Sequence, residues 1–172
     1  LEHIRETPWK PYPIAETKRN ETAAILFTTG STGPAKGVIY THGMFDAQVR
    51  FIKTHFNITY DDIDLPTFPL FALFDPALGM TSVIPEMDFT RPAQVNPENI
   101  IEAILDHGAT TMFASPALLN RVGTYGKEEE IRLPSLKRVI SAGAPVSPSN
   151  LETFSTMLNE DAQIHTPYGA TE

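Results

Sequence analysis

The sequence contains no cysteine. Disulfide bonds, thiolate metal sites and a cysteine nucleophile are therefore excluded, and this composition suits a cytoplasmic protein. No apolar stretch approaches the roughly 20 residues that a membrane-spanning helix needs. The start of the sequence, LEHIRETPWKPYP, is too polar for the apolar core of a signal peptide.

Basic residues are also in short supply, with 13 Lys and Arg against 21 Asp and Glu and a net charge of −8. General electrostatic attraction to nucleic acid is therefore not expected. A phosphate compound would have to be held by a local site. The five histidines show no metal-ligand spacing, and no cysteine accompanies them.

The 172 residues are enough for one domain. Residues 1–21 are polar and proline-rich, which is typical of a linker or edge segment. We expect residues 22–172 to form the folded part. The sequence stops directly after the glycine-containing turn TPYGATE, so we interpret it as a piece of a longer protein.

Short apolar runs alternate with segments of helical spacing. The pattern predicts strands over residues 22–27, 38–40, 110–114, 136–143 and 162–166, and helices over 44–56, 97–107, 116–126 and from 148 onward. One helix is marked with particular clarity, because Asn96 suits its cap, Pro97 its first position and Gly108 its end. Residues 61–80 show no clean period.

Strands that alternate with helices of about ten residues indicate an α/β fold, with a largely parallel sheet flanked by helices on both faces. Ligands of such sheets bind at the carboxyl ends of the strands. Three unusual segments each follow a predicted strand, namely TTGSTGPAKG (28–37), SAGAPV (141–146) and TPYGATE (166–172). We expect all three to face one crevice, with the first of them following a buried strand.

The segment TTGSTGPAKG has the chemistry of an anion site. Glycines at 30, 33 and 37 permit positive φ and let oxygens approach the main-chain N–H groups. Hydroxyl donors surround them, and Lys36 adds a positive charge. The segment is not the common nucleotide loop, because Gly37 stands where a serine or threonine must follow the lysine. A plain flexible connection is the other interpretation of these residues.

TTGSTGPAKG closely resembles the phosphate-loop signature of the adenylate-forming superfamily, which includes acyl-CoA synthetases, luciferases and the adenylation domains of peptide synthetases. YGATE (168–172) is similar to a second motif of that family, SAGAPV to its adenine-contacting turn, and FPLFALFD (68–75) to a motif beside its acyl pocket. The four motifs occur in family order. The resemblance implies that this chain is a fragment of the large N-terminal domain of such an enzyme.

This resemblance implies a reaction in which a carboxylate attacks the α-phosphorus of ATP to give an acyl-adenylate and pyrophosphate. It implies that the β- and γ-phosphates are held by Thr28, Thr29, Gly30, Ser31, Thr32, Gly33, Lys36 and Gly37. Thr171 would approach the α-phosphate, and Glu172 would coordinate Mg²⁺. Lys36, Thr171 and Glu172 are the implied catalytic residues.

The resemblance also implies that Tyr168 and Gly169 contact the nucleotide, with the Tyr168 ring stacked on adenine. Gly143, Ala144 and Pro145 would line the other side of the base. Phe68, Phe71, Ala72 and Phe74, together with Met80, are candidates for the acyl pocket, with ordinary core packing as their alternative role. The family often has a histidine where Ala72 stands, and the small side chain leaves room for a bulky or long acyl chain.

The stretches FPLFALFDPALG and VIPEMDFTRPAQ, with the ending TPYGATE, most resemble one branch, the β-lactone synthetases of bacterial olefin biosynthesis. The resemblance implies a long-chain, 3-hydroxy fatty acid as the substrate. CoA and the substrate's own β-hydroxyl are both open as the acceptor. The family's ribose-binding aspartate and its small C-terminal domain lie downstream of YGATE, so we expect these 172 residues alone to be inactive.

Two other functions are compatible with the residues. One is a nucleotide-binding module without catalysis, and the other is a phosphotransferase, which the missing hydroxyl after Lys36 disfavours. Asp61, Asp62 and Asp64 are interpreted as a solvated connection rather than a calcium loop. The sequence predicts no oligomeric state.

Overall fold

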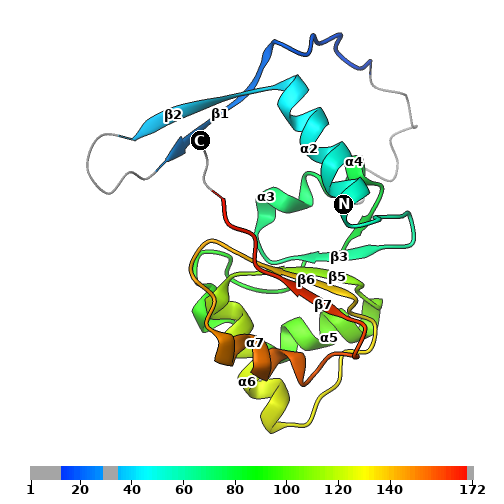
Figure 1. Ribbon diagram of the computed structural model, residues 1–172, viewed down its shortest axis with the longest axis vertical. Helices are drawn as coiled ribbons and strands as arrows, with labels where there is room; N and C mark the ends of the chain where they lie inside the picture. Colours follow the sequence, from blue (N-terminus) through cyan, green and yellow to red (C-terminus); the bar gives the residue numbers. More distant parts are fainter. Residues whose placement is uncertain (1–12, 29–34, 170–172) are drawn as a thin grey trace, which may run out of the picture. The chain divides into compact units, whose positions relative to one another are not determined.

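The computed structural model describes residues 13–28 and 35–169. The chain divides into two compact units, the first ending at Ala47 and the second beginning at Gln48. The first unit contains a β-hairpin, and the second contains a parallel sheet with its helices (Figure 1).

In the first unit, β1 (Thr22–Thr28) pairs antiparallel with β2 (Lys36–Thr41). Helix α2 (His42–His55) begins directly after β2. The Tyr40 ring stacks on Phe45 of this helix with centroids 5.3 Å apart. The side chain of Arg19 also forms an ion pair of 2.8 Å with Asp46. The strands predicted over 22–27 and 38–40, and the helix over 44–56, are confirmed to within two residues.

The prediction that residues 22–27 form a buried strand is wrong. Alternate residues of a strand share one face, and on this face Ile25 is 52% exposed, Phe27 69% and Ile39 57%. The reason is that β1 pairs with β2 alone, in a two-stranded sheet of its own. The glycine-rich segment therefore connects the two strands of a hairpin and does not follow a strand of the parallel sheet.

The second unit contains a five-stranded sheet in the order β4-β3-β5-β6-β7, and every neighbouring pair is parallel. Its strands are β3 (Ile63–Pro66), β4 (Thr81–Ser82), β5 (Thr111–Ala114), β6 (Arg138–Ser141) and β7 (Gln163–His165). The predicted α/β fold with a parallel sheet is confirmed. The strands predicted over 110–114, 136–143 and 162–166 correspond to β5, β6 and β7.

Three helices cover one face of this sheet, namely α5 (Pro97–His107), α6 (Pro116–Glu128) and α7 (Pro148–Ser155) (Figure 1). The short 3₁₀ helix η1 (Pro92–Gln94) precedes α5. The main core lies between this helical layer and the sheet, where Leu65, Met112 and Val139 of the strands meet Ile104, Leu118 and Phe154 of the helices. This packing of apolar surface holds the carboxyl ends of the strands in place.

Side-chain caps begin the three helices of this layer, and the predicted cap Asn96 is one of them. The Asn96 side chain accepts a hydrogen bond from the Glu98 N–H, and Ser115 and Ser147 accept from the backbone N–H groups of Leu118 and Asn150. Gly108 ends α5 in the left-handed region, with φ of 63°. Each cap satisfies helix N–H or C=O groups that have no partner within the helix.

The connection from β3 to β4 contains two short helices, α3 (Pro69–Ala72) and α4 (Asp75–Leu78). A small second core forms here from Ile58, Leu78 and Met80. The helices α3 and α4 and the strands β3 and β4 each have four residues or fewer, which is too short to show a period in the sequence. No helix in the described part of the chain has the length and apolar character needed to cross a membrane.

Candidate functional site

The hairpin brings the two ends of the glycine-rich segment together. Thr28 and Lys36 are the last partners in the register of β1 and β2, so the chain leaves one strand and enters the other at neighbouring positions. Lys36 is exposed at the start of β2. The predicted phosphate-binding residues Thr29, Gly30, Ser31, Thr32 and Gly33 lie outside the described residues, as do Thr171 and Glu172.

Gly37 lies inside β2, and its backbone is not in the left-handed region. Its lack of a side chain has a different reason, since a Cβ atom here would lie 3.0 Å from Ile25 Cγ2 and 3.3 Å from Phe27 Cε1. Glycine at this position therefore makes room for two side chains of the facing strand. Its predicted role in phosphate binding stays a prediction.

In the second unit, parallel strands place two of the predicted ligand-binding segments at one edge of the sheet. The turn with Gly143, Ala144 and Pro145 follows β6, and the segment leading to Tyr168 and Gly169 follows β7. These strands are neighbours and run parallel. Both segments therefore leave the carboxyl edge, which is where ligands of α/β sheets bind.

The groups at this edge are open to a ligand. Gly143 has φ of 95°, and no heavy atom lies within 4 Å of the place where its Cβ would be. The Tyr168 side chain is fully exposed. Ala144, Pro145 and Gly169 are exposed as well. An aromatic ring without packing partners and a bare turn suit the stacking of a flat heterocycle.

Aromatic side chains gather at the carboxyl ends of β3 and β5. Phe71 of α3 contacts Phe113 of β5 edge-on, with centroids 4.5 Å apart, and Phe68 contacts Phe71 at 5.3 Å. Phe68 and Phe71 are 43% and 40% exposed. The Thr67 hydroxyl donates a hydrogen bond of 2.7 Å to the main-chain oxygen of Phe113, which joins the two strand ends.

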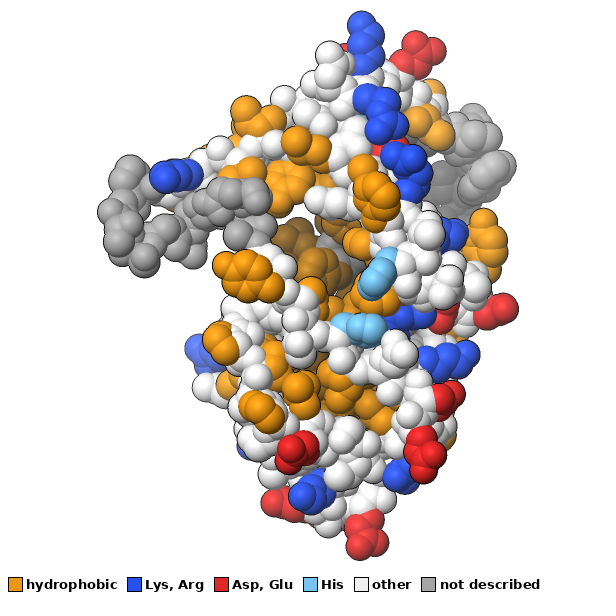
Figure 2. All heavy atoms as spheres, viewed as in Figure 1, with side chains coloured by type: hydrophobic (Ala, Val, Ile, Leu, Met, Phe, Trp, Pro, Cys, Tyr) orange, Lys and Arg blue, Asp and Glu red, His pale blue; other side chains and the backbone are white. Residues whose placement is uncertain are grey.

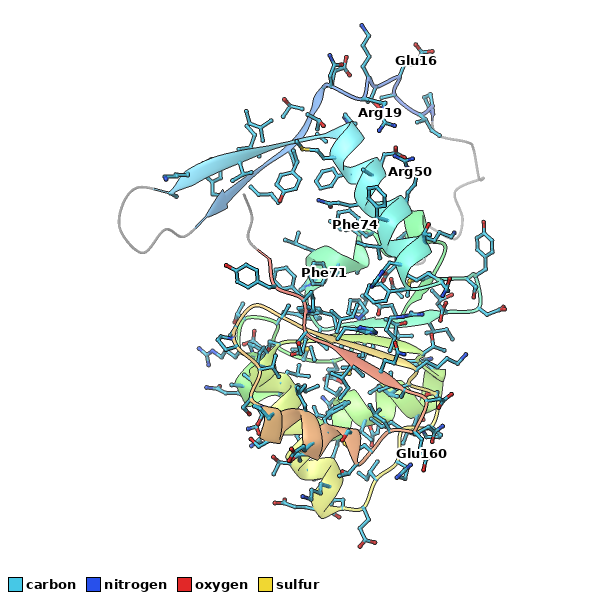
Figure 3. All side chains as sticks on the ribbon, in the orientation of Figure 1. Glu16, Arg19, Arg50, Phe71, Phe74 and Glu160 are labelled. Carbon is cyan, nitrogen blue, oxygen red and sulfur yellow. The ribbon has the colours of Figure 1, made fainter. Side chains whose placement is uncertain are left out.

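The other candidates for the acyl pocket lie elsewhere. Met80 belongs to the small second core, and Phe74, at the junction of α3 and α4, packs against that core (Figure 3). Ala72 is half-buried at the end of α3. The described surroundings of Phe74 and Met80 favour the core role that the sequence left open, whereas Phe68 and Phe71 have surface available to a ligand.

Phe113 and Thr67 were not predicted from the sequence. One signal was available for Phe113, because it stands between Met112 and Ala114, both of which are buried in the main core. Strand alternation therefore places its side chain on the opposite face. Thr67 had no comparable signal, since β3 itself was not predicted.

The interpretation of Asp62 and Asp64 as a solvated connection is wrong. Asp62 is 7% exposed and Asp64 6%, because the chain enters β3 at Ile63. Asp64 is the register partner of Ser82 on one side and of Thr111 on the other, and Thr111 is the partner of Arg138. These side chains form a polar row across four strands, on the sheet face opposite the main core.

Hydrogen bonds organise this polar row. Arg138 donates to the Thr111 hydroxyl at 2.6 Å and to the main-chain oxygen of Phe56 at 2.7 Å. Its guanidinium lies 4.0 Å from Asp62 Oδ1. At the other end of the row, the Ser82 hydroxyl donates to the carboxylate of Asp75, which is 3% exposed.

The carboxyl groups respond differently to this environment. Burial raises the pKa of Asp64 to about 8, and the neighbouring carboxylate of Asp75 adds to the increase. Burial also raises the pKa of Asp75, against a smaller effect of the Ser82 hydrogen bond. For Asp62, burial is outweighed by hydrogen bonds from Thr59 and Thr110 and by Arg138, which together lower its pKa.

Surface charge on the second unit is mixed. Figure 2 shows acidic and basic side chains interspersed over the visible surface of the sheet and its helices. A broad field of one sign is therefore not what would attract a polyanion to this surface. Within the described residues, no group of three or more His, Asp or Glu side chains lies close enough together to hold a metal ion.

The model of the AMP-binding enzyme family matches residues 2–172 of this chain. The chain belongs to this family. The expected resemblance to the adenylate-forming superfamily is thereby confirmed.

Two curated relatives are olefin beta-lactone synthetases. The chain is 51% identical over 159 residues to the enzyme of Stenotrophomonas maltophilia (strain K279a) and 48% identical over 159 residues to that of Xanthomonas campestris pv. campestris. Each match covers 92% of this chain and 28% of the relative. The chain therefore spans about a quarter to a third of the length of these AMP-binding enzymes.

A solved structure supports the fold. McyG A-PCP, complexed with phenylalanyl-adenylate, superposes with a TM-score of 0.76 and 23% identity, over 99% of this chain and 29% of that one. This likeness confirms the expected α/β fold with its parallel sheet.

Proposed function

We propose that the protein containing this chain activates a long-chain 3-hydroxy fatty acid with ATP and closes the product to a β-lactone. The observation that carries this proposal is the identity of 51% and 48% to two olefin beta-lactone synthetases over 92% of the chain.

The first step is attack of the substrate carboxylate on the α-phosphorus of ATP. A P–O bond to the acyl group forms, the bond to the β-phosphate breaks, and pyrophosphate leaves with the bonding electron pair. Negative charge increases on the pyrophosphate. Main-chain N–H groups of residues 29–33, their hydroxyls and the Lys36 ammonium would stabilise this charge where it develops.

The second step needs an oxygen nucleophile near the acyl carbonyl. In the proposed reaction the β-hydroxyl of the same substrate attacks the carbonyl carbon, loses its proton, and displaces AMP to give a four-membered lactone. No CoA is consumed. The exposed Phe68 and Phe71 would contact the alkyl chain, and the small Ala72 leaves space beside them.

The nucleotide base is proposed to bind at the carboxyl edge of β6 and β7. Tyr168 would stack on adenine, and Gly143, Ala144 and Pro145 would line its other side. The open backbone of Gly143 and the unpacked ring of Tyr168 support this assignment. Gly169 and Thr171 would lie along the phosphates, with Thr171 next to the α-phosphate.

Mg²⁺ is the metal that the family implies. Carboxylate oxygens are the ligands that Mg²⁺ prefers, so the donor chemistry of Glu172 fits the ion. When bound, Mg²⁺ would offset the charge of the triphosphate. Glu172 itself would hold the ion, while Lys36 would contribute the second positive charge from the hairpin.

The test is a product assay on the full-length protein with a 3-hydroxy fatty acid, ATP and Mg²⁺, with and without CoA, followed by mass spectrometry. We expect β-lactone and AMP in both reactions. If acyl-CoA forms in place of the lactone, and only when CoA is present, the second step is thioesterification to CoA and not lactone closure. ATP binding without any AMP release would indicate a non-catalytic nucleotide-binding module instead.

A further inference from the structure

Two buried carboxyl groups lie together on the sheet face opposite the main core. Asp64 of β3 and Ser82 of β4 are register partners, and the Ser82 hydroxyl donates a hydrogen bond to Asp75 at the start of α4. Asp64 and Asp75 are 6% and 3% exposed. Ser82 is therefore the strand neighbour of Asp64 and the hydrogen-bond donor to Asp75, in a place that water hardly reaches.

The one guanidinium of the polar row does not compensate both acids. Arg138 directs its donors to the Thr111 hydroxyl and the Phe56 main-chain oxygen, and its nearest acid is Asp62 at 4.0 Å. The described residues also offer no metal-binding group of three side chains. Two adjacent buried carboxylates cannot both stay ionised at low cost. A proton is the remaining means of compensation.

The pKa directions agree with this geometry. Burial and the neighbouring Asp75 raise the pKa of Asp64 to about 8, and burial also raises the pKa of Asp75. Arg138 opposes the effect on Asp64, and the Ser82 hydrogen bond opposes it on Asp75. The pair therefore holds a proton at neutral pH.

Asp75 belongs to the connection from β3 to β4, which also contains the exposed side chains of Phe68 and Phe71. Asp75 also accepts hydrogen bonds at its main-chain oxygen from Gly79 and Met80, each 2.9 Å long. Val83 N–H donates to the Asp64 main-chain oxygen at 2.8 Å. Strand β4 has only two residues and lies at the edge of the sheet. Ser82 thus joins the start of α4 to the edge strand β4, which pairs with β3 at Asp64.

We propose that Asp64 and Asp75 share one proton, and that this proton fixes residues 67–82 on the sheet. Asp64 is then a positioning residue for Phe68 and Phe71. The effect of the proton on residues 67–82 is argued from the contacts above. Its effect on acyl binding rests on the proposed function.

Hydrogen exchange measured by mass spectrometry on the full-length protein tests the first part. Opening of residues 67–82 exposes Asp64 to water, where its pKa is ordinary, so opening becomes more favourable as the pH rises toward 8. After correction for intrinsic exchange rates, we expect protection of peptides from 67–83 to fall at least tenfold from pH 6 to pH 8. Peptides from α6 serve as the internal reference.

Asp64→Asn is the decisive variant, because asparagine has nearly the size of aspartate and carries no titrating group at any pH. We expect its protection over 67–83 to change less than twofold between pH 6 and pH 8. The control Asp61→Asn, at an exposed acid three positions away, keeps the wild-type change. If Asp64→Asn disturbs the α6 reference, Asp75→Asn is the second variant, and we expect its protection to change less with pH than that of the wild type, because the carboxylate that adds to the pKa of Asp64 is gone. Wild-type protection that is independent of pH, or a tenfold loss in both amide variants, would overturn the proposal.

Steady-state kinetics test the connection to acyl binding. We expect Asp64→Ala to raise KM for the fatty acid several-fold with little change in KM for ATP, and Asp64→Asn to restore the wild-type value. Equal changes in both KM values would refute the positioning role. A full-length protein without adenylation activity would refute the proposed function alone, because the exchange experiment does not depend on turnover.

Discussion

Lys36 is the one charged residue of the predicted phosphate site that the structure describes, and it stands exposed at the start of β2. In the proposed reaction, its ammonium would act where the leaving pyrophosphate gains charge. Removing one such stabilising group typically lowers kcat by about 10²–10³.

We therefore expect Lys36→Ala in the full-length protein to reduce the rate of adenylate formation by about that factor, and Glu172→Ala to weaken the use of MgATP as well. ATP–pyrophosphate exchange measures both. Lys127→Ala, at an exposed lysine near the end of α6, is the charge-matched control and should keep the wild-type rate. Full exchange activity in both site variants would show that the phosphates are held elsewhere.

Gly143 allows a backbone effect to be separated from a binding effect. Its φ of 95° and that of Gly108, at 63°, are both unfavourable for a residue with a Cβ atom, and neither position has neighbours within 4 Å of that atom. Gly143→Ala and Gly108→Ala should each cost about 1–2 kcal/mol of folding free energy.

Only Gly143→Ala should also weaken nucleotide binding, because Gly108 ends α5 and is not part of the predicted site. Denaturant titration gives the stability of each variant, and calorimetric titration with ATP gives the affinity. Equal affinity losses in the two variants would mean that the turn after β6 does not contact the nucleotide.

Helix caps were predictable because they depend on a few adjacent residues. Asn96-Pro97 and Ser147-Pro148 each fix a helix start through one side chain and one proline, and both begin where expected. The exposure of β1 was not predictable, since an apolar run looks the same in a parallel sheet and in a half-exposed hairpin. The contact partners of a strand depend on residues far away in the sequence.

Two glycines of α6 make room for the residues packed against this helix, Gly123 for Phe154 of α7 and Gly126 for Met157 in the chain that follows α7. A Cβ atom at Gly126 would lie 2.1 Å from Met157 Cε, and one at Gly123 would lie 3.3 Å from Phe154 Cα. Met157 and Phe154 are fully buried. Both glycines lie inside a predicted helix, and glycine usually weakens a helix. Nothing in the sequence indicated which residues face them.

Gly126→Ala should therefore destabilise the protein by about 1–3 kcal/mol, since overpacking outweighs the gain in helix propensity. The urea midpoint of unfolding measures this. Combining Gly126→Ala with Met157→Val should recover part of the loss, because the shorter side chain removes the overlap. Strictly additive effects in this double-mutant cycle would contradict the close contact between positions 126 and 157.

The family and the carboxyl edge could be predicted from the full set of motifs in their order along the chain. The burial of Asp62 and Asp64 could not be predicted. It depends on β3, α4 and β4 together, and each of these elements is too short to be recognised in the sequence. The hairpin and the parallel sheet also fall into separate compact units. Motif order thus identified the enzyme family before any single strand could be assigned its neighbours.

A consequence concerns activity of the 172 residues by themselves. They span 28% of the length of the two olefin beta-lactone synthetases, and Ile25, Phe27 and Ile39 form an exposed apolar face on the hairpin. We expect the isolated chain to show no fatty-acid-dependent ATP–pyrophosphate exchange above background, whereas the full-length protein exchanges readily. Robust exchange by the isolated chain would place the complete catalytic machinery within these residues.

Stability of the full-length protein should depend on pH through Asp64. Its pKa is about 8 in the folded protein and near 3.8 when unfolded, so the unfolded chain releases this proton first. The contribution to stability is fully present below about pH 4, declines as the pH rises, and is lost once the pH exceeds about 8. Each pH unit in this window costs at most about 1.4 kcal/mol.

Asp64→Asn removes the titration and should become more stable than wild type as the pH rises from 5 to 8, with the difference in melting temperature growing steadily. Thermal unfolding at half-unit pH intervals measures this difference. Asp61→Asn, at an exposed acid, should show no such trend. A difference that stays constant with pH would mean that Asp64 is ionised in the folded protein, and that its charge is balanced by a cation rather than by a proton.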